Sequence, residues 1–234
     1  MLATSSTFGQ AAWSALGMAR RFSGVSRIEG ATALTRMPCL TTSSASATVK
    51  AATAALLAVN DLADEATVAR VYDGVPQLWA SIHLAGGFAM SPVAETGKAA
   101  LMRQLDMNFV TCFLCCRAAV NAFARSGEGG RIVNVAARPA LEWRSGAGMA
   151  AYTASKAAVA ALTVALAEEV AKDGILVNAV APSILDTAAN RAAMPKADHA
   201  KWPKVEAVAA TILFLASPDN QVTRGAIVPV YGRS

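Results

Sequence analysis

A tyrosine and a lysine lie four residues apart in the segment AAYTASKAAV, which spans residues 150–159. Residues at positions i and i+4 are neighbours on one face of a helix, so the phenol of Tyr152 and the ammonium of Lys156 can converge there. A cation beside a phenol favours the phenolate and lowers its pKa. Such a pair could exchange a proton near neutral pH. On this segment alone, the alternative is a half-buried tyrosine beside a solvated lysine.

The elements that position this pair follow a regular alternation from residue 52 onward. Five apolar runs read as strands, at 55–61, 78–87, 131–137, 175–182 and 225–231. Between them lie helical patterns at 64–75 with Asp64 as N-cap, at 95–126, at 150–172 with Gly174 at its C-terminal end, and at 205–217. Apolar strands that alternate with amphipathic helices predict a parallel sheet covered on both faces. Such sheets bind ligands at the carboxyl ends of their strands.

Length and composition favour one globular domain. The chain has 234 residues, of which 54% are hydrophobic and 16% are charged. A membrane span needs roughly 18 apolar residues. The longest apolar run, at 157–167, is shorter and continues into a charged segment, so we expect no membrane partner.

The positive charge is concentrated at the start of the chain. Residues 1–50 hold five basic side chains against one acid, together with fifteen Ser and Thr, whereas the rest carries 16 basic and 15 acidic groups. A near-neutral body argues against nucleic-acid binding. An Arg- and Ser-rich start is typical of an organellar transit peptide, and a degenerate first βαβ unit is the alternative. We therefore treat 1–50 as an atypical segment and 51–234 as the domain, with a cytoplasmic location expected unless the start is such a peptide.

Four cysteines suggest reduced thiols rather than a disulfide framework. Cys112 and Cys115 form a C-x-x-C, followed directly by Cys116, but they lie in an apolar helical stretch with no second ligand pair nearby. We expect them to pack in the core, without a metal or redox role.

Five spaced motifs together resemble the short-chain dehydrogenase/reductase family over about 55–234. They are YTASK, LDMNFV, NDL, HLAGG and the strand pair RIVNV and LVNAVAPSILDT. The resemblance implies a Rossmann-type doubly wound α/β fold that binds NAD(H) or NADP(H). It implies Tyr152 as catalytic acid/base, Lys156 as its partner, and Asn108 holding a proton-relaying water. The implied cofactor contacts also include Gly17, Asp61, Leu62, Ala85, Gly86, Pro182, Ile184 and Thr187.

Several positions depart from the family pattern. Ala136 and Ala137 stand where the family has an active-site serine, so a substrate carbonyl loses one hydrogen-bond donor. Ser145 could replace that serine from the following loop. His83 and Leu84 replace two asparagines, and Ser183 replaces a glycine. The glycine-rich turn that holds the pyrophosphate keeps only Gly17.

Within the family, the segments AGGF, GAGMAAY and 185–202 look most similar to dihydropteridine reductases. This similarity implies hydride transfer to an electrophilic carbonyl, quinonoid or pterin-like substrate. The alternative is a cofactor-deficient scaffold or binding protein without turnover. We also expect a homodimer or homotetramer that forms through the helices at 95–126 and 150–172.

The segment 183–204 is longer than the usual connection, so we expect it to form a mobile lid over the substrate. Met194 and Trp202 would then close over a flat ring.

Overall fold

The computed structural model describes residues 62–234, whose four strands form one parallel sheet in the order β1-β2-β3-β4. The strands are β1 (Ala80–His83), β2 (Gly130–Val135), β3 (Ile175–Pro182) and β4 (Ile227–Val230). Val135 of β2 lies opposite Val180 of β3, so their carboxyl ends lie at one edge of the sheet. The strand predicted at 55–61 lies outside the described residues.

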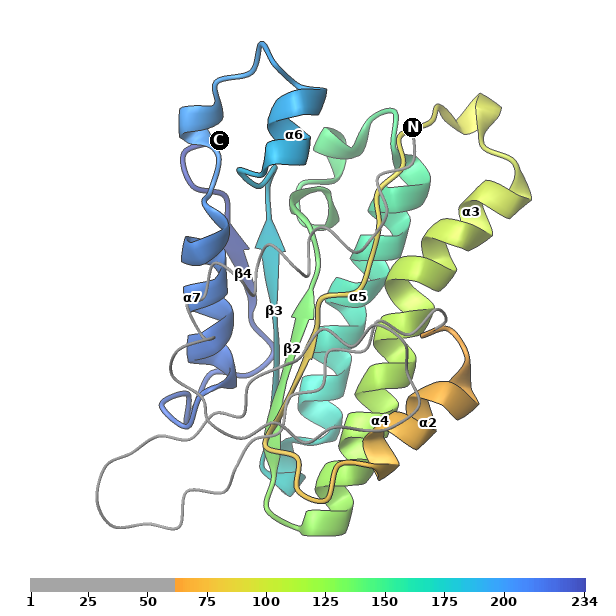
Figure 1. Ribbon diagram of the computed structural model, residues 1–234. Helices are drawn as coiled ribbons and strands as arrows, with labels where there is room; N and C mark the ends of the chain where they lie inside the picture. Colours follow the sequence, from red (N-terminus) through yellow and green to blue (C-terminus); the bar gives the residue numbers. More distant parts are fainter. Residues whose placement is uncertain (1–61) are drawn as a thin grey trace.

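Helices cover both faces of the sheet, as the alternation predicted (Figure 1). The α-helices are α2 (Glu65–Asp73), α3 (Lys98–Leu105), α4 (Thr111–Ser126), α5 (Ala150–Glu169), α6 (Ala188–Ala193) and α7 (Val205–Ala216). Helices α4 and α5 pack on one face and α7 on the other. Short 3₁₀ turns lie at Val93–Glu95, Arg138–Ala140, Trp143–Gly146, Ala171–Asp173 and His199–Lys201. The predicted α/β class is confirmed.

Two predicted helix ends are confirmed. The carboxylate of Asp64 accepts a hydrogen bond from the Thr67 N–H at 2.8 Å, which caps α2. Gly174 adopts φ 69°, a left-handed conformation that favours glycine, and closes the 3₁₀ turn that follows α5. The pattern at 95–126 is less regular than expected, because a π-helical turn, Asp106–Val110, lies between α3 and α4.

The core has two layers, one on each side of the sheet. Strand residues alternate between them, so Ile132 packs toward α4 and α5 whereas Val133 packs toward α7. The continuous helix Lys98–Ser126 and helix α5 are long and apolar enough to cross a membrane by length and composition. The expectation that no segment reaches that length is therefore wrong. In this structure α4 and α5 pack against the sheet.

Candidate active site

Helix α5 carries the predicted catalytic pair across the carboxyl end of β2. The Lys156 ammonium is buried and donates a hydrogen bond to the Val135 carbonyl at 2.8 Å. The Tyr152 ring packs edge-on against Phe88, with the ring centres 5.0 Å apart. Among residues 62–234, no group is hydrogen-bonded to the Tyr152 hydroxyl.

Burial, rather than the neighbouring cation, controls the protonation of this pair. It raises the pKa of Tyr152 to about 12 and lowers the pKa of Lys156 to about 8. The lowered tyrosine pKa expected from the i,i+4 spacing is therefore wrong for this arrangement. The physical reason is that the phenol is itself buried, and removal from water destabilises the charged phenolate. Tyr152 thus carries its proton at neutral pH.

Asn108 lies in the π-helical turn and is completely buried. Its amide makes two 3.0 Å hydrogen bonds with the backbone of Gly87, accepting from the N–H and donating to the carbonyl. It also donates to Ser155 Oγ at 3.1 Å. π-Helical turns are frequent at functional sites because they redirect a side chain. The side chain therefore fixes the loop after β1 to helix α5, and the predicted water relay stays a prediction.

Gly86 is the point at which this loop meets two of the predicted catalytic residues. A Cβ added to Gly86 would lie 2.7 Å from Asn108 Oδ1 and 3.2 Å from Lys156 Nζ. Glycine is therefore needed here for space rather than for a special backbone angle. The structure thus brings together Gly86, Asn108 and Lys156, which are far apart in the sequence.

The other predicted cofactor residues fall into two groups. Pro182 ends β3 in the core, Ile184 follows with 43% of its surface exposed, and Thr187 caps α6 by accepting a hydrogen bond from the Asn190 N–H. These lie beyond the carboxyl end of the sheet, where a ligand is expected. Ala85 is exposed in the loop after β1, and Leu62 is half-buried before α2. Gly17 and Asp61 lie outside the described residues.

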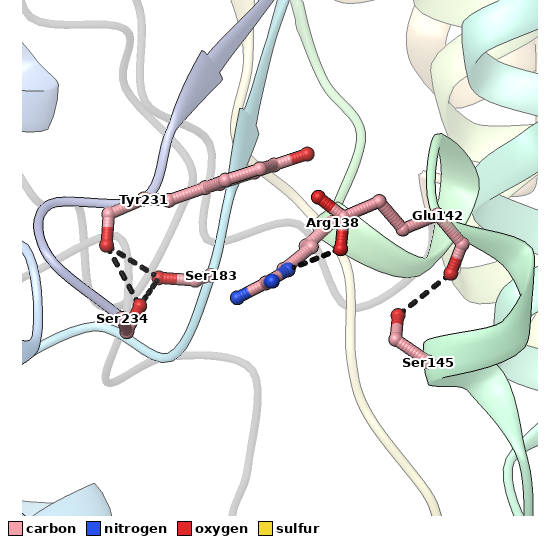
Figure 2. A network of polar contacts seen from close by, with 6 residues as sticks. All are labelled: Arg138, Glu142, Ser145, Ser183, Tyr231 and Ser234. Atoms are coloured by element: carbon pink, nitrogen blue, oxygen red, sulfur yellow. Dashed lines mark hydrogen bonds and ion pairs between the residues drawn. The ribbon is translucent and has the colours of Figure 1, made fainter.

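Two buried alanines occupy the positions at which the family has its active-site serine. Ala136 and Ala137 are both buried, and the hydroxyl of Ser145 donates to the Glu142 carbonyl at 2.7 Å (Figure 2). Ser145 is therefore already engaged and does not supply the lost donor. No other residue was predicted to replace it.

Arg138 directly follows this position and was not singled out by any sequence motif. Its Nε donates to Glu142 at 2.7 Å, and its guanidinium lies over the Tyr231 ring, 4.9 Å from the centre. Ser183, at the end of β3, holds the chain end through the Tyr231 carbonyl at 3.1 Å and Ser234 Oγ at 2.7 Å. Figure 2 shows that these residues come from three segments, and that Arg138 of the first segment lies next to Tyr231 of the last.

Part of the segment predicted as a lid is fixed. Trp202 is buried and packs on the His199 ring with the centres 4.6 Å apart. Asp186 and Arg191 form a bidentate ion pair across the start of α6. In this structure Trp202 therefore packs on His199 rather than over the edge of the sheet, and closure of the segment stays a prediction. Met194 lies between these anchors, with its carbonyl 2.8 Å from His199 Nε2.

Comparison with known proteins agrees with this geometry. A sequence model described as short chain dehydrogenase matches residues 30–198. A short-chain type dehydrogenase/reductase of Picea abies is 31% identical over 197 residues, which are 76% of this chain and 70% of that protein. A (5R,7aS)-5-hydroxy-7a-methyl-1-oxo-2,3,5,6,7,7a-hexahydro-1H-indene-carboxyl-CoA reductase of Mycobacterium tuberculosis is 36% identical over 158 residues, covering 64% of this chain and 60% of that protein.

Solved structures share the same fold. A short-chain type dehydrogenase/reductase from Mycobacterium ulcerans has a TM-score of 0.67 at 26% identity and covers 74% of this chain and 67% of that one. The structure of ElxO with NADP bound has a TM-score of 0.66 at 25% identity, with 74% and 75% of the two chains covered. The chain spans 53% to 60% of the length of several curated relatives that it matches. By its sequence match and its architecture, this chain belongs to the short-chain dehydrogenase family.

Proposed function

We propose that the protein is an NAD(P)H-dependent oxidoreductase in which Tyr152 supplies the proton. The observation that carries this proposal is the meeting of Gly86, Asn108 and Lys156 below the exposed end of helix α5. Within residues 62–234 the Tyr152 hydroxyl keeps its proton and has no hydrogen-bond partner, one helical turn away from the buried Lys156. A positioned acid of this kind is what reduction of a carbonyl or imine requires.

The described residues fit the nicotinamide half of such a cofactor. Pro182, Ile184 and Thr187 line the carboxyl end of β3, the edge at which parallel sheets bind ligands. The NADP bound to the relative ElxO supports the same class of cofactor here. When bound, a reduced nicotinamide supplies a hydride. The residues of this chain orient it, and Lys156 offers a hydrogen-bond donor to its ribose.

The substrate class follows from the alanines at 136 and 137. Without the usual hydroxyl, a substrate that builds a full oxyanion loses one donor, and such a loss typically costs about 10²–10³ in rate. A quinonoid or pterin-like substrate develops little oxyanion and avoids that loss. We therefore propose an electrophilic carbonyl, quinonoid or pterin-like compound as substrate. The alternative is a scaffold that binds no cofactor.

The experiment that tests this function uses one change, Ala137→Ser. The parent protein is first titrated with NADH and NADPH by fluorescence. Then kcat/KM is measured for quinonoid dihydropteridine and for an aliphatic ketone. We expect the parent to prefer the pteridine, and the restored hydroxyl to raise the ketone rate by about 10²-fold with little effect on the pteridine.

Ala136→Ser is the matched control, because Ala136 packs in the core toward α5 and a hydroxyl there faces apolar neighbours. A parent that already prefers ketones would contradict the pteridine assignment and leave a general carbonyl reductase. If neither NADH nor NADPH binds, the scaffold alternative is correct.

We further propose that the chain forms a homodimer or homotetramer through α4 and α5. Phe113 on α4 and Val164 on α5 expose 44% and 46% of their surfaces, a large apolar area for one side of a monomer. Phe113→Arg is expected to lower the mass measured by light scattering at micromolar concentration. Phe214→Arg, on the opposite face, is the control. A parent that is already monomeric would contradict the proposal.

A further inference from the structure

Three cysteine and histidine side chains meet in the core between β1 and α4. The side-chain nitrogen of His83 and the sulfurs of Cys112 and Cys116 all lie within 4.8 Å of one another, and all three residues are buried. Cys112 and Cys116 are one helical turn apart on the face of α4 that packs on the sheet. The C-x-x-C motif is therefore not the pair that meets, since Cys115 is directed to the Tyr72 hydroxyl.

A fourth polar atom faces the same point. Asn134 Oδ1 lies 2.8 Å from His83 Nδ1 and 3.5 Å from Cys116 Sγ. The orientation of this amide is fixed, because Asn134 Nδ2 donates to Thr163 Oγ1 at 2.9 Å and that hydroxyl donates to the Val159 carbonyl. One nitrogen, two sulfurs and one oxygen thus converge from two strands and one helix.

The other side of the histidine ring is held by two hydroxyl groups. His83 Nε2 lies 2.8 Å from Ser81 Oγ and 3.3 Å from the Tyr72 hydroxyl. Histidines that ligate metals almost always donate their second ring N–H to a neighbouring group, which fixes the tautomer and the ring plane. The hydroxyls provide that support at Nε2, while Nδ1 faces Asn134 Oδ1 and Cys116 Sγ.

We propose that His83, Cys112 and Cys116 form a buried zinc site, with Asn134 Oδ1 at the fourth position. Zn²⁺ takes sulfur at about 2.3 Å and nitrogen at about 2.0–2.1 Å in a tetrahedron, which separates such ligands by about 3.6 Å. His83 Nδ1 and Cys116 Sγ are 3.6 Å apart.

Charge also favours zinc at this position. Two thiolates neutralise the two charges of Zn²⁺, so the loaded site places no net charge in the low-dielectric core. Binding releases two thiol protons, and the histidine proton moves from Nδ1 to Nε2, where the Nε2–H donates a hydrogen bond to Ser81 Oγ. The proposal is independent of the oxidoreductase function, because metal binding alone reports on it.

The test refolds the full chain under reducing conditions in the presence of increasing amounts of Zn²⁺ or Co²⁺, so that the ion reaches the site before the core closes over it. We expect one metal per chain, sulfur-to-cobalt charge-transfer absorption with a tetrahedral d–d spectrum, and two protons released per Zn²⁺. X-ray absorption at the zinc edge should count two sulfur ligands. Cys116→Ala and His83→Asn should each weaken binding at least 100-fold, and Ser81→Ala by about 10–100-fold.

Cys115→Ala is the matched control, since Cys115 is also buried on α4 but lies outside the cluster. It should bind zinc as the parent does. Absence of stoichiometric metal in the folded parent, or equal loss in Cys115→Ala and Cys116→Ala, overturns the proposal. If circular dichroism shows that a variant is unfolded, X-ray absorption of the zinc-loaded parent provides the test. Fewer than two sulfur ligands around the metal would then overturn the proposal.

Discussion

Tyr152→Phe is expected to lower turnover by about 10²–10⁴-fold, the usual contribution of a positioned general acid, while the fold and the cofactor affinity stay nearly unchanged. The reason is structural. Within the described chain the Tyr152 hydroxyl has no hydrogen-bond partner that the change would orphan, and phenylalanine keeps the ring that packs on Phe88. Only the transferable proton is lost.

The measurements are kcat/KM, the dissociation constant of the reduced nicotinamide, and the melting temperature of parent and variant. Tyr231→Phe is a useful comparison, because it removes a second hydroxyl and keeps the ring beneath Arg138. Activity of Tyr152→Phe within a few fold of the parent would remove the tyrosine from the mechanism. A large drop in melting temperature would show instead that the hydroxyl has a structural role.

The elements that build the sheet could be predicted because their signals are local. Each strand is a short apolar run, and the caps at Asp64 and Gly174 depend on one residue and its neighbours. Tyr152 and Lys156 could be paired for the same reason, since helix geometry fixes residues four apart. The pKa values of these two residues could not be predicted from the sequence, because their burial depends on the strands and loops that pack against α5.

The parts of the site that were missed depend on contacts between distant segments. Asn108 was placed correctly on a helix, but the π-helical turn that directs its amide to Gly87 has no sequence signature. The meeting of His83 with Cys116 joins residues on β1 and α4, and the nearby C-x-x-C motif suggested a different pair. Such contacts depend on how the strands pair in the sheet and how the helices pack on it, and the sequence of a single segment does not reveal either.

Gly86→Ala is expected to lower kcat/KM by on the order of 10²-fold, as displacements of about 1 Å near reacting groups do. The new methyl carbon would stand 2.7 Å from Asn108 Oδ1, well inside van der Waals contact. Asn108 cannot turn away cheaply, because the same oxygen accepts the Gly87 N–H. The loop after β1 must therefore move, and Lys156 loses its position with it.

Gly97→Ala is the matched control for this change. It adds the same methyl group at the N-cap of α3, where nothing lies within 4 Å of the new carbon. We expect activity at the parent level and a stability loss of at most about 1 kcal/mol, as for other N-cap exchanges to alanine. If both variants retain full activity, contact at Gly86 does not position the catalytic lysine. If only Gly86→Ala loses activity while both remain folded, the close approach of loop, amide and ammonium is what aligns the site.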